Sequence, residues 1–128
     1  MGAGRVTGLG GVFFKARDPD RLYAWYENHL GLKRTEGGVL FRWREKDADA
    51  PGTTVWALFK QDTKYFQPSP SPFMLNYRVE NIDALLERLR AEGVQVDERR
   101  EDSDFGRFAW VMDPEGNRIE LWEPPPEQ

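Results

Sequence analysis

One pattern of secondary structure occurs twice in this chain, and this repeat constrains the fold more than any other feature. An apolar strand leads into a helix and then into three short strands, first in about residues 8–66 and again in about residues 73–124. Asp20 and Asp83 lie at matching positions of the two predicted helices, which sets an offset of 63 residues. The same offset aligns Phe14 with Tyr77, Lys15 with Arg78, Gly11 with Met74, and Ala57 with Glu120. The sequence therefore predicts two tandem βαβββ modules.

The start and end of each predicted helix carry recognisable signals. Asp18 is a suitable N-cap, Pro19 suits the first helical position, and Gly31 follows the last apolar residue. In the second module Asn81 is the N-cap and the helix stops at Gly93. Apolar residues at spacings of three and four predict that one face of each helix packs on a sheet. These faces are Leu22, Trp25, Tyr26 and Leu30 in the first helix, and Ile82, Leu85, Leu86 and Leu89 in the second.

Short apolar and β-branched segments predict the strands of both modules. They are residues 12–16, 32–35, 39–44 and 53–59 in the first module, and residues 73–79, 94–96, 107–112 and 118–122 in the second. Residues 67–72 contain three prolines, which interrupt regular structure and mark the linker between the modules. We therefore expect an α+β fold with two mixed sheets, one from each half.

Composition sets the class of protein. At 128 residues with 39% hydrophobic residues, the chain has enough apolar material for one packed domain over residues 1–128. The net charge is −4 and the basic residues are scattered, which argues against a nucleic-acid partner. No cysteine is present, so disulfides, thiolate zinc sites and cysteine nucleophiles are excluded. The longest apolar runs, such as residues 8–14, are too short to span a membrane. We expect a soluble, cytoplasmic domain without a membrane partner.

Three parts of the chain carry a resemblance to a known family. They are the strand and helix start of residues 12–19, the matching start of residues 77–83, and the closing turn and strand of residues 113–122. In this order they resemble the glyoxalase / bleomycin-resistance / dioxygenase (vicinal oxygen chelate) superfamily. The resemblance implies that two βαβββ modules form a cupped mixed sheet that holds a divalent metal and an oxygen-bearing substrate. We also expect a homodimer, and the sequence leaves open whether the modules pair within one chain or across the dimer.

The positions of the family's metal ligands are largely replaced in this chain. The resemblance implies a His on the first strand of each module and a carboxylate on the last strand, ligands that suit Mn, Fe, Ni or Zn. Here the first-strand positions are Gly11 and Met74, and the last-strand positions are Ala57 and Glu120. Glu120 is the one family-like ligand retained, so we expect no metal and no other cofactor.

Strand alternation predicts which residues line the cup, because residues two apart share a face. Glu120 is the candidate catalytic residue; on its strand Ile119 and Leu121 point toward the helices, and Arg118 faces the cup. The candidate ligand-binding residues are Phe13, Lys15, Met74, Asn76, Arg78 and Trp122. Ligand sites generally combine such apolar walls with a few polar groups.

Each candidate also has a purely structural interpretation. Lys15 and Arg78 could lie at strand ends with their charged groups in water, and Glu120 could be a structural carboxylate paired with one of them. Phe13 and Trp122 could be core aromatics. His29, the one histidine, falls in the last turn of the first helix, where a cation suits the helix end.

Three functions remain open from the sequence. The first is a metal-independent small-molecule binding protein, in which aromatic walls and the charges of Lys15, Arg78 and Glu120 hold an amphipathic or anionic ligand. The second is a metal-dependent lyase or dioxygenase of the same superfamily, with a divalent metal bound by Glu120 and ligands that the sequence does not identify. The third is an interaction or regulatory module whose cup is filled by its own side chains. Measurement of the metal content of the purified protein distinguishes the first function from the second.

Overall fold

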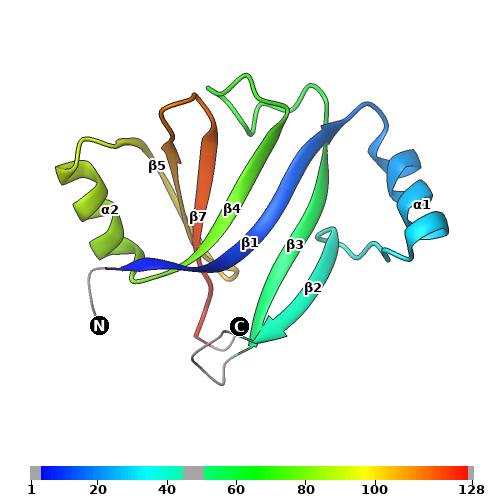
Figure 1. Ribbon diagram of the computed structural model, residues 1–128, viewed down its shortest axis with the longest axis horizontal. Helices are drawn as coiled ribbons and strands as arrows, with labels where there is room; N and C mark the ends of the chain where they lie inside the picture. The colour runs from blue at the N-terminus through cyan, green and yellow to red at the C-terminus, as the bar shows by residue number, and fades with distance from the viewer. Residues whose placement is uncertain (1–3, 45–50, 127–128) are drawn as a thin grey trace.

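The fold is one curved seven-stranded sheet with a helix on each flank (Figure 1). The computed structural model describes residues 4–44 and 51–126. Within these ranges the strand order is β2-β3-β1-β4-β7-β6-β5. The strands are β1 (Arg5–Ala16), β2 (Val39–Arg44), β3 (Pro51–Lys60), β4 (Phe73–Glu80), β5 (Gln95–Ser103), β6 (Gly106–Met112) and β7 (Arg118–Glu123). The helices are α1 (Pro19–Leu30) and α2 (Ile82–Ala91), and neither is long and apolar enough to cross a membrane.

The two halves meet at the pairing of β1 with β4. These strands run antiparallel, with Val12 opposite Leu75 and Phe13 opposite Met74. Val12 and Leu75 are also equivalent under the offset of 63 residues, so an approximate two-fold axis passes between them. The prediction of two separate mixed sheets is therefore wrong, because backbone hydrogen bonds between β1 and β4 join both halves into one.

The predicted repeat register is confirmed by the parallel strand pairs. Phe13 on β1 lies opposite Ala57 on β3. Asn76 on β4 lies opposite Glu120 on β7. Each residue of the second pair is 63 positions after its equivalent in the first, so Ala57 and Glu120 occupy corresponding places in the two halves.

Three strand predictions require correction. The predicted first strand begins at residue 12, but β1 begins at Arg5. Residues 32–35 do not form a strand; Thr35 makes an isolated bridge with Gly38 and donates to its carbonyl from both backbone and side chain, which produces a turn. The first half is therefore βαββ. In the second half β5 continues far beyond the predicted residues 94–96, to Ser103. The sequence did not predict this extension because the second part of β5 is a run of charged residues. A strand at the edge of a sheet tolerates charge on both faces.

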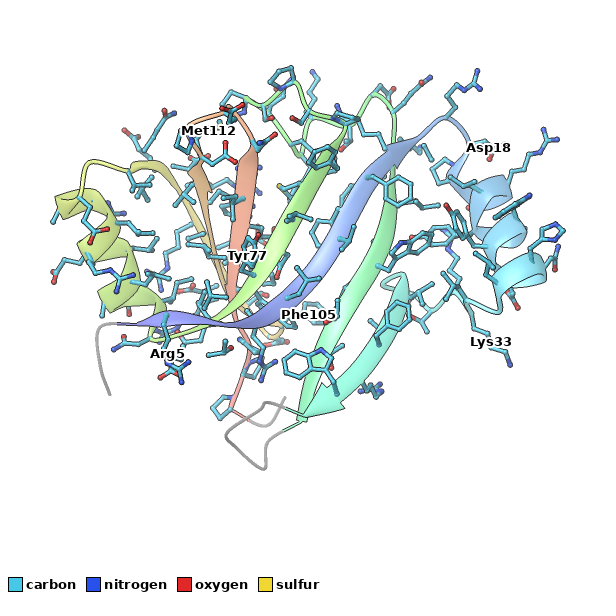
Figure 2. All side chains as sticks on the ribbon, viewed as in Figure 1. Arg5, Asp18, Lys33, Tyr77, Phe105 and Met112 are labelled. Atoms are coloured by element: carbon cyan, nitrogen blue, oxygen red, sulfur yellow. The ribbon has the colours of Figure 1, made fainter. Side chains whose placement is uncertain are left out.

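The prediction for the inner face of α1 is only partly correct. Asp18 caps the helix at its first turn (Figure 2), and Leu22 and Tyr26 are partly buried. Trp25 and Leu30, expected in the core, are 50% and 63% exposed. Tyr23 is buried instead, and its hydroxyl accepts a hydrogen bond from the backbone N–H of Leu58 (2.9 Å). That bond rotates the helix so that Tyr23 faces the sheet.

The inner face of α2 is confirmed. Ile82, Leu85 and Leu86 are buried and Leu89 packs at the edge of the same cluster. They contact the outer, convex side of the sheet at Val79, Ala109, Val111 and Leu121. Burial of each such side chain contributes roughly 1.5–3 kcal/mol.

Replacement of Tyr23 by Phe tests the anchoring of α1. The change leaves the buried N–H of Leu58 without its acceptor, so we expect the free energy of unfolding to fall by about 1–3 kcal/mol. Tyr26→Phe is the matched control on the same helix and should change it by less than about 0.5 kcal/mol. Urea denaturation of both variants measures the difference. Equal effects would contradict the anchoring role of Tyr23.

Candidate functional site

The carboxylate of Glu120 is the centre of the candidate site. It lies on the concave side of the sheet, is 2% exposed and is enclosed by three neutral donors. The hydroxyl of Tyr65 and the indole N–H of Trp110 (3.0 Å) both donate to Oε2. The amide Nδ2 of Asn76 donates to Oε1 (2.6 Å). We call these three residues with Glu120 the carboxylate cage.

The surroundings of the cage shift two acid–base equilibria. Burial raises the pKa of Glu120 above its ordinary value, and the hydrogen bonds from Tyr65, Asn76 and Trp110 oppose that shift. Burial also raises the pKa of Tyr65, and the adjacent Glu120 charge raises it further. Tyr65 therefore keeps its proton and remains a donor at neutral pH.

A local feature of the backbone makes room for Asn76. The pairing of β1 with β4 shifts register between Leu9 and Gly11, which places Gly10 in a bulge. A Cβ atom on Gly10 would come within 1.9 Å of Oδ1 of Asn76. Glycine at this position is therefore required for the amide to reach Glu120.

The segment after β3 fills the cup around the cage. Phe66 is fully buried in the concave cluster with Phe13, Ala57, Met74 and Trp110. The ring of Tyr65 stacks on Phe59, with centroids 5.6 Å apart. Residues 67–72 lie between β3 and β4, and the two aromatic residues just before them act as a plug. The sequence did not predict this role, although two adjacent aromatic residues beside a proline-rich segment are a signal for it.

Charged groups of β5 and β7 surround Trp110. The guanidinium carbons of Arg118 and Arg99 lie 4.9 and 5.1 Å from a Trp110 ring centroid. Arg118 also donates to the backbone oxygen of Tyr65 and forms an ion pair with Asp97 (3.1 Å). Sequence analysis placed Arg118 on the cup face but missed Asp97 and Arg99, because β5 was predicted too short.

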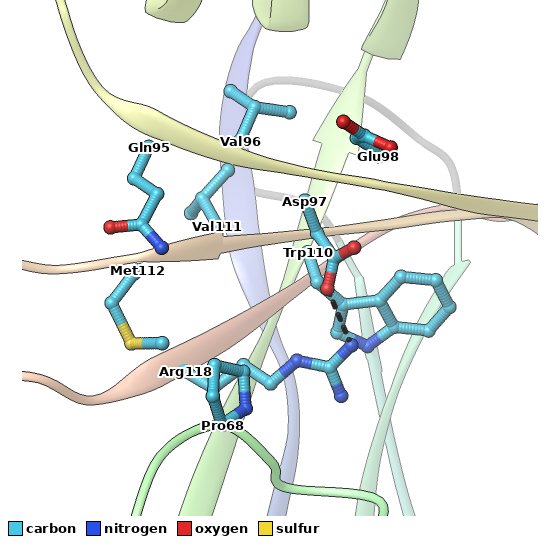
Figure 3. Close-up of a pocket in the computed structure, with 9 residues that line it drawn as sticks. All are labelled: Pro68, Gln95, Val96, Asp97, Glu98, Trp110, Val111, Met112 and Arg118. Atoms are coloured by element: carbon cyan, nitrogen blue, oxygen red, sulfur yellow. Dashed lines mark hydrogen bonds and ion pairs between the residues drawn. The ribbon is translucent and has the colours of Figure 1, made fainter.

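A cavity of about 370 Å³ opens beside this group (Figure 3). Its walls come from β5, β6, the start of β7 and the segment before β4. Figure 3 shows Arg118 extending below Trp110 toward Asp97, with Gln95 and Met112 on the other side. The lining residues are Pro68, Gln95, Val96, Asp97, Glu98, Trp110, Val111, Met112 and Arg118. The volume is within the range of small-molecule sites.

Comparison with known proteins assigns this architecture to a family. The sequence model of the Glyoxalase/Bleomycin resistance protein/Dioxygenase superfamily matches residues 8–121. The chain belongs to this superfamily. A search of the curated proteins finds no match.

Several solved structures are similar to this chain in fold. Methylmalonyl-CoA epimerase from Mycobacterium tuberculosis is 26% identical, with a TM-score of 0.60; the alignment covers 94% of this chain and 90% of that one. A variant of the Streptomyces coelicolor methylmalonyl-CoA epimerase in complex with 2-nitronate-propionyl-CoA is 16% identical, with a TM-score of 0.70 and coverage of 97% and 99%. An NAD-dependent benzaldehyde dehydrogenase from Legionella pneumophila is 18% identical, with a TM-score of 0.58 and coverage of 90% and 98%.

The residues at the superfamily's metal positions do not fit a metal ion in this chain. Gly11, Met74 and Ala57 offer no imidazole or carboxylate, and both oxygens of Glu120 already accept hydrogen bonds within the cage. Among residues 4–44 and 51–126, no three His, Cys, Asp or Glu side chains form a group that could hold an ion. His29 packs against Trp25 on α1 (centroids 4.8 Å apart).

The uncharged candidate residues are all buried, but they lie in different parts of the sheet. Phe13 and Met74 are buried in the cluster around Phe66. Trp122 is buried at the other end of β7 and donates from Nε1 to the carbonyl of Phe105 (2.8 Å). Asn76 belongs to the cage. Ile119 and Leu121 pack toward α2, as predicted.

Lys15 and Arg78 do not form an ion pair with Glu120. Nζ of Lys15 lies 5.5 Å from the ring centroid of Phe66. Arg78 is buried, contrary to the interpretation that its head lies in water, and its guanidinium carbon is 5.8 Å from the Trp43 ring centroid. The neutral donors of the cage contact the Glu120 carboxylate instead of these cations.

The pH dependence of stability tests the raised pKa of Glu120. In the pH range between its ordinary value of 4.5 and its raised folded value, the folded protein binds more protons than the unfolded chain. The contribution of this group is therefore complete below the ordinary pKa and is lost as the pH rises through the folded pKa. Urea denaturation from pH 4 to pH 8 should show the stability of wild type relative to Glu120→Gln decreasing with pH. A constant difference would contradict the shift, and an increasing one would reverse its sign.

A second variant tests the cage. Tyr65→Phe removes one donor from a buried carboxylate while it keeps the stacking on Phe59, so the free energy of unfolding should fall by about 1.5–3 kcal/mol at pH 7. Tyr77→Phe, on the convex side, is the matched control and should change it by less than about 0.5 kcal/mol. A loss no larger than that of the control would show that Glu120 does not depend on Tyr65.

Proposed function

We propose that this chain is a metal-independent small-molecule binding protein of the superfamily. The observation that carries the proposal is the cage: Glu120, the retained carboxylate of the metal set, is buried and fully hydrogen-bonded to neutral donors. Both oxygens of this carboxylate already accept hydrogen bonds from the protein, so Glu120 would have to give up at least one of them to bind a metal. We infer that the cup binds its ligand without a metal.

The cavity beside Trp110 supports a ligand site in the second half of the cup. It combines the apolar Pro68 and Met112 with the charged Asp97 and Arg118, as small-molecule sites generally do. Lys15, Arg78 and Trp122 remain predicted ligand contacts, and so does Asn76. Phe13 and Met74 are proposed to support the wall through Phe66. A catalytic role for Glu120 also remains a prediction.

The alternative function is a metal-dependent reaction of the superfamily, which the likeness to methylmalonyl-CoA epimerases favours. Under that alternative Glu120 would have to leave its three hydrogen bonds to bind a metal. Such a change breaks contacts to a buried charge, which is costly without replacement partners.

Metal analysis tests the proposal directly. We expect less than a tenth of an equivalent of Mn, Fe, Co, Ni or Zn after purification without added ions, and an unchanged melting temperature in EDTA. A metal that bound only the folded protein at one hundred times its Kd would add about 2.7 kcal/mol of stability. Stoichiometric metal with a lower melting temperature in EDTA would overturn metal independence.

Hydrogen exchange tests the alternative. Methylmalonyl-CoA incubated with the protein in deuterium oxide should gain deuterium no faster than the buffer control at the carbon between its carboxylate and thioester. The measurement is made by mass spectrometry, with and without added Mn²⁺ or Co²⁺. Metal-stimulated exchange that Glu120→Gln abolishes would support the metal-dependent reaction instead.

A cytoplasmic location remains an expectation.

We also propose the homodimer that the sequence predicts. The convex side of β1 and β4 lies between the helices: α1 packs on β3 and on the end of β1, and α2 packs on β5 and β7 (Figure 1). Leu9 and Phe73 are 40% and 44% exposed there. We expect a second copy to cover this strip, which the approximate two-fold axis crosses between Val12 and Leu75. Light scattering after size exclusion should give a dimer for the wild type and a monomer for Phe73→Glu; an unchanged dimer would place the interface elsewhere.

A further inference from the structure

The helix α1 borders an open cleft that shares no residue with the carboxylate cage or with the cavity beside Trp110. The cleft has a volume of about 710 Å³, which is within the range of small-molecule sites. It is lined by the end of β1, the first turns of α1 and the two residues between them. Figure 1 shows α1 at one flank of the sheet and β5 toward the other, so the two cavities are far apart. We call this second cavity the α1 cleft.

One wall of the α1 cleft is an aromatic ring that the fold leaves uncovered. Tyr23 faces the sheet in place of Trp25, which is 50% exposed. The Trp25 ring contacts the ring of Tyr26 edge-on, with centroids 5.1 Å apart, and is supported by it. The half-buried Leu22 and the buried Ala16 complete the apolar part of the lining. The cleft therefore offers an apolar surface against which an aromatic ring can pack.

Two arginines line the same cleft without a partner. Within the described ranges, the guanidinium groups of Arg17 and Arg21 make no hydrogen bond, ion pair or ring contact. Asp18 is the acid among the lining residues, and its carboxylate accepts from the backbone N–H of Arg21 (3.2 Å) as the N-cap of α1. Two cations and one anion leave a surplus of positive charge at the cleft, although the whole chain carries −4.

The chemistry of these groups decides which ligand fits the α1 cleft. The planar guanidinium of arginine binds carboxylates and phosphates through paired N–H donors. A cationic ligand would be repelled by both arginines, and an uncharged one would leave them without a counterion. Arg21 and Trp25 are four residues apart on α1, so both side chains lie on the same face of the helix. A ligand that packs a ring on Trp25 can therefore place an anionic group at Arg21.

From this arrangement we propose that the α1 cleft binds small aromatic oxyanions, with the ring against Trp25 and the carboxylate or phosphate group accepting from Arg17 and Arg21. The site goes beyond the proposed function, because it lies outside the cup and needs neither the cage nor the cavity beside Trp110. Three probes with the same ring system separate the possible ligands. 2-Naphthoate carries a carboxylate, 2-naphthyl phosphate carries a phosphate, and 2-naphthamide is uncharged.

A ¹H–¹⁵N NMR titration with these three probes tests the proposal. At least one anion should cause saturable shifts at the indole N–H of Trp25 and the backbone N–H of Leu22, and 2-naphthamide should bind at least about tenfold more weakly. The anion that binds more tightly identifies the preferred group. Equal affinity for 2-naphthamide, or shifts at the indole N–H of Trp110 instead of Trp25, would overturn the assignment.

Variants at exposed positions locate the contacts without disturbing the fold. Arg17→Gln and Arg21→Gln should each weaken the anion at least about fivefold, whereas Arg90→Gln, on the exposed face of α2, should not change its affinity. Trp25→Ala should also weaken it at least about fivefold, with Leu30→Ala, exposed on the same helix, as the matched control. Affinity that is the same in these variants as in their controls would overturn this site. It would leave the proposed function of the cup intact, which the metal analysis tests separately.

Discussion

The concave side of this protein is organised around a carboxylate that is buried without a cation in hydrogen-bond contact. An ionised carboxylate removed from water is costly unless donors replace its hydration. Glu120 obtains them from Tyr65, Asn76 and Trp110, which belong to the segment after β3, to β4 and to β6. The cage therefore fixes three elements relative to β7. It also holds the aromatic plug against the cup, because Tyr65 donates to Oε2 and Phe66 follows it directly in the chain.

The approximate two-fold symmetry shows how the halves have diverged in chemistry. Phe13 and Ala57 face each other in the first half, at the positions that Asn76 and Glu120 occupy in the second. The first half is accordingly an apolar wall, completed by Phe66, while the second carries the polar groups. The same backbone geometry thus holds two different environments. Function is expected in the second half, where buried polar groups and a cavity lie together.

The sequence predicted the parts of the fold that depend on local pattern. Both helix caps, the face of α2 and the repeat register follow from residue type and spacing, and the structure agrees. The face of α1 differs because a tertiary hydrogen bond from Leu58 to Tyr23 outweighs the apolar periodicity. The extension of β5 and its contacts to Arg118 could not be predicted, since an edge strand carries no alternating pattern and its bulge breaks the register. The burial of Phe66 depends on the shape of the assembled cup, which no short segment encodes.

Arg118 connects the cage to the cavity. Through one terminal nitrogen it holds the carbonyl of Tyr65, through another it binds Asp97 on the β5 bulge, and its guanidinium lies against Trp110. Tyr65 and Trp110 both donate to Glu120, so one side chain contacts the cavity wall and two of the three cage donors. The aromatic plug and the β5 bulge are therefore held by the same side chain, so loss of the Arg118 guanidinium would release the Tyr65 carbonyl and Asp97 together.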